Sequence, residues 1–318
     1  ALTNLQIFTR TAYSSFTETL RQQVDLFNSA SAGAVILRTG SMTGDYEDTS
    51  FWQKLSGLVR RRDAYASGAV TAISLTQLLD TAVRVDAGTP PVNIDPHWFQ
   101  RIEAAPGEEG VVIGRQLAVD TLADMLNTGI GVCVSAIGQV AAVVNSDAAN
   151  FLTLRSLNTT AAKFGDRASD IKVHILHSTP MHDLFDNALA NAERLFTHAS
   201  VNVMEDGFGR RFIMTDSPSL VDLTPTPDNY RTLSLAQGAI MIQRNNDFLD
   251  NIETSNGDES LQRTYQAQWS YNVAIRGFAW DKTNGGKSPS DAELLTATNW
   301  DQTATDIKDL AGVMTITK

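Results

Sequence analysis

The chain has 318 residues, of which 42% are apolar and 19% are charged, and no low-complexity tract appears in it. These values are typical of a folded globular protein that is large enough for one or two domains. The 36 acidic residues outnumber the 25 basic residues, so the formal net charge is -11. A surface built to grip the phosphates of nucleic acid is therefore disfavoured.

The first 32 residues place aromatic side chains, among them Phe8 and Phe16, between polar neighbours. This pattern predicts an amphipathic arm or short helices that need a partner surface. Ser15 and Glu18 have the spacing of a helix capping box. A charged head followed by an apolar segment is missing, so we expect no signal peptide and a cytoplasmic site of synthesis.

Residues 34–85 alternate between loop-like and periodic pieces, which predicts an extended excursion that returns to the body. The pieces are a short strand at 34–38, a polar segment at 40–49, a helical piece at 51–58, the basic run Arg60, Arg61 and Arg62, and an apolar stretch at 69–85. The basic run could be a solvated face, a DNA contact or a contact with an acidic patch on another chain. Because the remaining sequence is acidic, we favour the contact with another chain.

A long helix is predicted at 114–144, after a Pro- and Gly-rich segment at 86–110. Apolar and small residues recur every three to four positions, and the helix would be roughly 45 Å long. Gly129 and Gly131 could split it into two helices. A membrane span is excluded because Asp120 and Asp124 precede the apolar run and polar residues interrupt it.

The single cysteine, Cys133, lies on the apolar stripe of this helix. It cannot form an internal disulfide, so we expect it to pack as a small buried hydrophobic residue.

The next segment predicts a compact unit that begins with a half-buried strand at 171–176. A helix follows, capped by Ser178 or Thr179 with Pro180 at its first position, and apolar spacing continues to residue 196. Two strands, at 201–204 and 211–215, are joined by a turn-forming EDGFG sequence.

The last third predicts mainly β structure. A hairpin at 230–235 and 239–243 would turn at Gln237 and Gly238. Alternation of apolar and polar residues at 261–275 predicts a strand much longer than usual. A short capped helix at 292–295 and a closing strand at 312–317 complete the chain.

One cluster of residues has the chemistry of an enzyme site, namely His174, His177, Ser178, His182 and Asp183. A metal site or a Ser/His/Asp hydrolase could use such residues. We favour a structural role, because the cluster lacks a glycine elbow and a second pair of ligands, and because a helix cap explains the serine.

The GFGR sequence at 207–210 lacks the phosphate-loop pattern and lies between strands rather than before a helix. The sequence thus predicts no catalytic, cofactor or metal site.

Several short sequence motifs resemble those of the major capsid proteins of tailed bacteriophages with the Hong Kong 97-type fold. The most telling are GDRASDIKVHILHSTPMHDL at 165–184, RRFIMTDSP at 210–218, YRTLSLAQGAI at 230–240, YNVAIRGFAWD at 271–281 and KSPSDAELLTATNW at 287–300. Leu176 stands where relatives have methionine before a His-Ser pair, which here is His177 and Ser178. These motifs occur in the same order as in the relatives, and the resemblance extends over most of the chain.

The resemblance implies an α+β Hong Kong 97-type capsid fold with a long spine helix, an extended loop, a peripheral domain and an axial domain. The implied parts are an N-terminal arm at 1–33, the extended loop at 34–85, a peripheral domain with the spine helix at 86–150, an axial domain at 151–228, and return strands of both domains at 229–318.

The implied function is self-assembly, as pentamers and hexamers, into an icosahedral shell around the double-stranded DNA genome of a tailed phage. Its partners would be copies of itself and, non-specifically, the packaged DNA, with no membrane; a scaffold protein, a decoration protein and the portal stay open. The expected location is the virion capsid, after assembly in the host cytoplasm. Candidate contacts between subunits are Arg60, Arg61, Arg62, Phe8 and Phe16.

Some relatives link a lysine to an asparagine covalently, but Lys54 is the only lysine of the excursion and no acceptor asparagine matches. We therefore do not transfer that chemistry. An encapsulin-like nanocompartment shell and a Ser/His/Asp hydrolase stay open as alternative functions.

Overall fold

A computed structural model of the chain describes residues 4–53, 59–94, 96–190, 203–205, 209–224, 227–255 and 262–318. Its α-helices are α1 (Asn4–Ala30), α2 (Pro96–Ala104), α3 (Pro106–Gly138), α4 (Leu154–Ala161), α5 (Ser178–Ala190) and α6 (Asp291–Leu294). Its short 3-10 helices are η1 (Ala141–Val143), η2 (Ala162–Asp170), η3 (Pro218–Leu220), η4 (Ala297–Asn299) and η5 (Ile307–Asp309).

Two separate sheets contain the strands of the described residues. The 9-stranded sheet consists of β1 (Val35–Gly40), β2 (Tyr46–Trp52), β3 (Gln77–Gly88), β4 (Val92–Asn93), β11 (Ile240–Asn245), β12 (Leu249–Ser255), β13 (Gln262–Ile275), β14 (Phe278–Trp280) and β15 (Trp300–Gln302). The 7-stranded sheet consists of β5 (Val144–Asp147), β6 (Ile171–Leu176), β7 (Val203–Glu205), β8 (Arg211–Met214), β9 (Val221–Asp222), β10 (Asn229–Ala236) and β16 (Gly312–Thr317).

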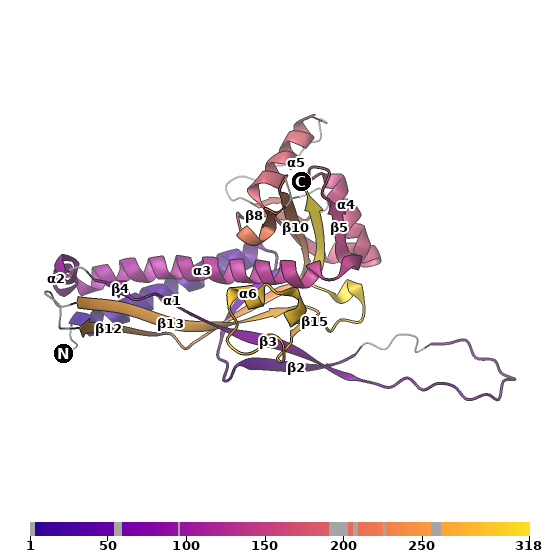
Figure 1. The fold of residues 1–318 in the computed structure, drawn as a ribbon, viewed down its shortest axis with the longest axis horizontal. Helices are drawn as coiled ribbons and strands as arrows, with labels where there is room; N and C mark the ends of the chain where they lie inside the picture. The colour runs from indigo at the N-terminus through magenta and orange to yellow at the C-terminus, as the bar shows by residue number, and fades with distance from the viewer. Residues whose placement is uncertain are drawn as a thin grey trace.

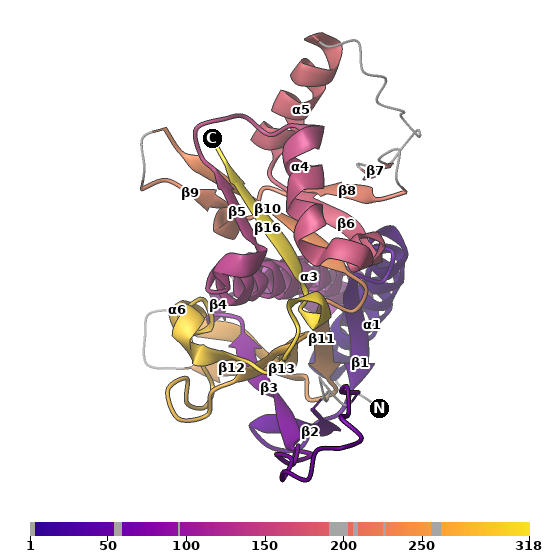
Figure 2. The same cartoon turned by 90° about the vertical axis from the view of Figure 1, so that its right-hand side faces the viewer.

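The molecule is elongated, and α3 follows its long axis (Figure 1). Seen along that axis, α3 lies between the two sheets, with β10 and β16 on one side and β3 and β13 on the other (Figure 2). The β2–β3 hairpin projects well beyond the body. The architecture confirms the predicted α+β class, with the predicted long helix and extended loop.

The spine helix α3 begins eight residues earlier than predicted and ends at Gly138. Pro106 occupies its first turn, where the missing N–H costs nothing, and Glu108 and Glu109 favour the positive end of the helix dipole. The Pro/Gly segment expected to be a connector therefore contains α2 and the start of α3. Beyond Gly138 the chain enters η1 and β5, because β5 pairs with β16.

The spine helix runs through Gly129 and Gly131 without a break, so these glycines do not split it into two helices. A Cβ at position 129 would lie 2.8 Å from Cδ1 of Ile242, and one at position 131 would lie 2.4 Å from Cδ2 of Leu295. The two glycines thus allow close packing of neighbouring side chains. By length and composition α3 could cross a membrane, but half of its most apolar stretch is buried in the chain, as in a core helix.

The N-terminal segment forms one helix, α1, whose partner surface is α3 of the same chain. Small residues on α3 let the two backbones approach, because a Cβ on Gly110 would lie 2.8 Å from the carbonyl oxygen of Phe8. Ser15 lies inside α1 and donates a hydrogen bond to the carbonyl oxygen of Val111, so the predicted capping box at Ser15 and Glu18 is wrong.

The long strand β13 organises the 9-stranded sheet and confirms the predicted alternation, with Leu261 outside the described residues. One edge of β13 pairs with β11 and β12, and the other edge pairs with β3 and β4. The Tyr271 hydroxyl donates to Asp124 of α3 at 2.9 Å and lies 3.1 Å from Thr128 Oγ1. These contacts fix the sheet to the spine.

The predicted hairpin at 230–243 is wrong, because its two strands belong to different sheets. β10 pairs with β16, β6 and β9, whereas β11 pairs with β1 and β13. The turn itself exists, since Gly238 has a φ of 68°. It carries the chain past α3 from one sheet to the other.

Other local expectations have mixed outcomes. The strands β6 and β16 are confirmed, β7 and β8 form the expected antiparallel pair, and Ser290 caps α6. Phe51 and Trp52 belong to β2, so the predicted helical piece at 51–58 is wrong at these two residues. The rest of that piece, 54–58, lies outside the described residues. Residues 191–196, at the end of the helix predicted after Ser178, also lie outside them. Cys133 is fully buried, as predicted.

Candidate inter-subunit surfaces

The extended hairpin consists of β2, β3 and the segment between them. Its outer part is the longest run of exposed residues in the described part of the chain. Its base is a regular antiparallel pair from Tyr46 opposite Val83 to Trp52 opposite Gln77. Beyond the base, every residue from 59 to 76 is exposed. Figure 1 shows this stretch reaching far from the core.

Large apolar side chains lie exposed along this hairpin. Tyr65 is 97% exposed and Val59 is 96% exposed. Soluble monomers rarely leave so much apolar surface in water, and such surfaces usually mark a binding site. The exposed apolar residues of the hairpin between positions 59 and 79, which we call the hairpin apolar set, are Val59, Tyr65, Val70, Ile73, Leu75 and, in the paired base, Leu79.

Ion pairs anchor the base of the hairpin to the body. Lys282 donates to Asp48 at 2.6 Å, and Lys287 pairs with Asp45 at 2.8 Å. The hydrogen bond from Lys282, with a second from Thr81, lowers the pKa of Asp48. The hairpin therefore leaves the body in a defined direction, while its outer part is available to another molecule.

The basic run at Arg60, Arg61 and Arg62 lies on the exposed outer hairpin. Within the described residues none of these guanidinium groups forms an ion pair, and the Arg60 side chain donates only to the carbonyl oxygen of Arg61. Lys54, the lysine of the excursion to which the covalent linkage of relatives was not transferred, lies outside the described residues.

Phe8 and Phe16 do not join the arginines at the surface. Both rings are 0% exposed within the single chain. Phe8 packs edge-on against Tyr265, and Phe16 packs against Phe248 and Trp269. In this conformation the two rings have no surface left for a second subunit, so their proposed contact role gives way to packing of α1 on the body.

The histidine cluster does not form a hydrolase or metal site. His174 is fully buried, with Nδ1 2.8 Å from Ser234 Oγ and its ring stacked on Phe212. Burial, and to a lesser extent the charge of Arg210, lowers the pKa of His174 to about 3, so the imidazole is neutral.

Ser178 lies next to His177, with Ser178 Oγ 3.4 Å from His177 Nδ1. Asp216 accepts a hydrogen bond from the backbone N–H of Ser178, and His177 Nδ1 accepts one from the backbone N–H of Thr179. These two side chains therefore cap α5, a role the sequence assigned to Ser178 or Thr179. Helix capping thus accounts for the position of Ser178 without a catalytic role.

Carboxylates gather elsewhere, around a cavity of about 470 Å³ between β3 and α3. Desolvation raises the pKa of Asp124, although the hydrogen bond from Tyr271 acts in the opposite direction. Even so, among the residues that the structure describes, no group of three or more His, Cys, Asp or Glu side chains could hold a metal ion. The acidic residues of this cavity are Asp86, Asp120, Asp124 and Asp291.

Comparison with solved structures places the fold among phage capsid proteins. The capsid asymmetric unit of cyanophage Pam1 matches with a TM-score of 0.55 at 12% identity, covering 87% of this chain and 85% of that chain. The capsid of Ralstonia phage GP4 matches with a TM-score of 0.51 at 10% identity, covering 89% and 86%. Microbacterium phage Oxtober96 matches with a TM-score of 0.50 at 13% identity, covering 91% and 90%. The fold is therefore that of a tailed-phage capsid subunit.

The family follows from the sequence itself. Residues 4–314 match the Gp13-like family model, described as "Major capsid protein 13-like", so the chain belongs to this family of major capsid proteins. No curated protein sequence matches the chain. Its function is that of a phage capsid shell protein, and this structural role, rather than catalysis, agrees with the geometry of the histidine cluster.

The sequence interpretation missed the hairpin apolar set as a functional surface. Its residues lie between positions 59 and 79, and their spacing follows neither the 3.6-residue period of a helix nor the two-residue period of a strand. The available signal was a group of large apolar residues inside a segment that otherwise reads as polar and extended.

Proposed function

We propose that the subunit assembles as pentamers and hexamers into an icosahedral shell that encloses the double-stranded DNA genome of a tailed phage. The observation that carries the proposal is the hairpin apolar set, held away from the body where only another molecule can cover it. Closed symmetric assemblies bury such surfaces on every copy at once.

The interactions within the shell can be weak one by one. Burying the hairpin apolar set on a neighbour would contribute on the order of 10 kcal/mol before the cost of ordering the loop. Because each subunit contacts several neighbours, the contributions reinforce one another while each contact stays reversible. Errors can then be corrected before the shell closes.

The chain divides, in this proposal, into the arm at 1–33, the extended loop at 34–85, the peripheral domain with its spine at 86–150, the axial domain at 151–228 and the return strands at 229–318. The 7-stranded sheet with α4 and α5 forms the compact end that would surround the five-fold and six-fold axes. Assembly would take place in the host cytoplasm, with scaffold, decoration and portal proteins as further partners.

The net charge of -11 supports only non-specific, weak contact with packaged DNA. A container with an acidic wall releases its genome more readily than one that binds phosphates tightly. Arg60, Arg61 and Arg62 would then contact an acidic patch on a neighbouring subunit. Raising the salt concentration should weaken assembly more than it weakens DNA retention, and the R60Q/R61Q/R62Q variant should lose that salt dependence.

Expression of the chain followed by electron microscopy tests the proposal. The wild type should form closed shells, while replacing Ile73 and Leu75 of the hairpin by serine should lower the yield of shells at least tenfold. Replacing Leu26 and Leu223 by serine is the matched control, because these leucines are also exposed but lie on the body. Equal yields from both double variants would contradict a docking role for the hairpin, and a wild type that stays monomeric would contradict the proposed function.

A further inference from the structure

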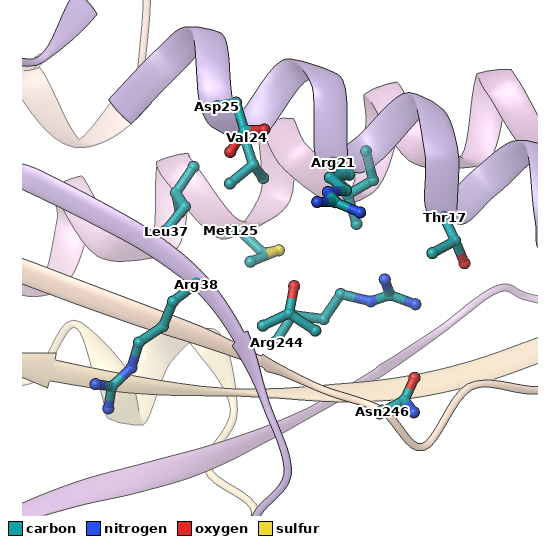
Figure 3. Close-up of a pocket in the computed structure, with 11 residues that line it drawn as sticks. Thr17, Arg21, Val24, Asp25, Leu37, Arg38, Met125, Arg244 and Asn246 are labelled. Carbon is teal, nitrogen blue, oxygen red and sulfur yellow. The ribbon is translucent and has the colours of Figure 1, made fainter. Parts of the chain in front are cut away.

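Three arginines from three different elements meet at one cavity on the α1 side of the body. The cavity has a volume of about 420 Å³ and lies between α1, β1 and β11. Arg21 comes from α1, Arg38 from β1 and Arg244 from β11 (Figure 3). Such a concentration of positive charge is notable in a chain whose net charge is -11.

Arg244 is the buried member of the group. Its residue is only 4% exposed, and neither Nε nor Nη2 has a hydrogen-bond partner. Phe16 offers its ring face 4.6 Å from the guanidinium carbon, which shields one side of the group. Figure 3 shows the side chain running between α1 and the strands below it. A buried guanidinium with free N–H groups is costly until an acceptor arrives.

The carboxylates near Arg244 do not satisfy it. Asp247 pairs instead with Arg84 at 2.9 Å and accepts hydrogen bonds from Ser270. Desolvation lowers the pKa of Arg244, although the nearby Asp247 and Tyr13 act in the opposite direction. Among the described residues, no carboxylate forms an ion pair with Arg244.

Arg21 and Arg38 are exposed and complete the cavity wall. Among the described residues neither forms an ion pair. Among the residues that line the cavity, Asp25 is the one carboxylate, against the three arginines. The cavity therefore has an excess of positive charge and hydrogen-bond donors and lacks acceptors.

We propose that this cavity receives an aspartate or glutamate side chain from a second copy of the subunit, with the exposed Arg21 and Arg38 as hydrogen-bond donors at the rim and the buried charge of Arg244 beneath them. A carboxylate accepts two parallel N–H bonds from a guanidinium, and the enclosed Arg244 attracts it through its charge. The inference rests on the proposed assembly, which supplies acidic neighbours: 36 residues of each copy are acidic. A DNA backbone follows exposed surface and is too wide to reach the buried Arg244.

The rim arginines give the first test. The R21Q/R38Q variant should need an about tenfold higher subunit concentration to assemble at low salt. The R115Q/R155Q variant removes the same charge from exposed arginines outside the cavity and should assemble as the wild type does. If R21Q/R38Q also assembles as the wild type does, the cavity proposal is overturned while the proposed function stands. If wild-type chains form no shells, both fail.

Arg244 gives a second test that separates assembly from folding. The R244M variant should keep or raise the melting temperature of the free subunit, because methionine removes an unpaired buried charge. The same variant should assemble at least tenfold less well than the wild type. A purely structural arginine would instead lower the melting temperature and leave assembly of the folded fraction unchanged, and this result would overturn the proposal.

A cryo-EM map of the assembled shell identifies the occupant directly. Density that connects a neighbouring subunit's acidic side chain to Arg21 or Arg38 supports the proposal. An isolated inorganic anion, nucleic acid density or an empty cavity in the assembled shell would each refute it.

Discussion

The spine depends on the absence of a side chain at Gly114, where α1 and α3 come closest. A Cβ at this position would lie 2.3 Å from the carbonyl oxygen of Ala12 and 3.0 Å from the backbone nitrogen of Phe16. Carbon–oxygen contacts are normally about 3.3–3.6 Å, so Gly114→Ala must push the two helices apart by roughly 1 Å. Both obstructing atoms belong to the backbone, and no rotamer change can relieve the contact.

Two opposing contributions set the size of the effect. Overpacking costs about 1–3 kcal/mol, and a rigid backbone obstacle places Gly114→Ala at the upper end of that range. Alanine returns about 1 kcal/mol through its higher helix propensity. The free energy of unfolding should therefore fall by about 2 kcal/mol, measured by urea denaturation of the free subunit.

Gly107→Ala on the same helix is the matched control, because a Cβ there meets no atom within 4 Å. This variant should be as stable as the wild type or up to about 1 kcal/mol more stable. The two alanine variants should then differ by about 2–3 kcal/mol. If their urea midpoints coincide, the close approach of α1 and α3 at Gly114 does not exist in solution.

Three further predictions concern local features. Ser290→Ala should lower the free energy of unfolding by about 1 kcal/mol in urea denaturation, because Ser290 and Glu293 form a reciprocal capping box; an unchanged midpoint would refute the cap. His174 has a folded pKa of about 3, so the unfolded chain binds more protons below pH 6.5, and stability should fall with decreasing pH by at most about 1.4 kcal/mol per unit. His174→Gln should flatten that slope between pH 4.5 and pH 7, and an unaltered slope would contradict the neutral buried histidine. Ser178→Ala should leave the yield of shells unchanged in electron micrographs, while loss of an ester-hydrolysing activity in the variant would revive the hydrolase alternative.

Local sequence patterns predicted the elements whose signals are contained in neighbouring residues. The alternation at 262–275 fixes β13, since the side-chain period of a strand is two residues. Ser290 and Glu293 specify the start of α6 through a contact only three residues apart. The stripe around Cys133 likewise predicted a long, half-buried helix.

Boundaries were harder to predict because competing local signals have similar strength. Pro106 and Gly107 suggested a connector, yet proline is also favoured in the first helical turn. Gly129 and Gly131 suggested a split into two helices, yet α3 is continuous and Ile242 and Leu295 pack against these glycines. At the two glycines, tertiary packing thus agrees with one of two structures that the sequence allowed.

The sequence by itself determined the acidic net charge, the long spine helix and the long strand. It also contains, in order, the motifs that resemble those of capsid proteins. The tertiary structure alone decided that β10 and β11 lie in different sheets, that Phe16 is buried under Arg244, and that Arg21, Arg38 and Arg244 share a cavity. Arg21 and Arg244 are more than 200 positions apart along the chain. Their proximity depends on how helices and sheets pack, and no periodicity within either segment encodes that packing.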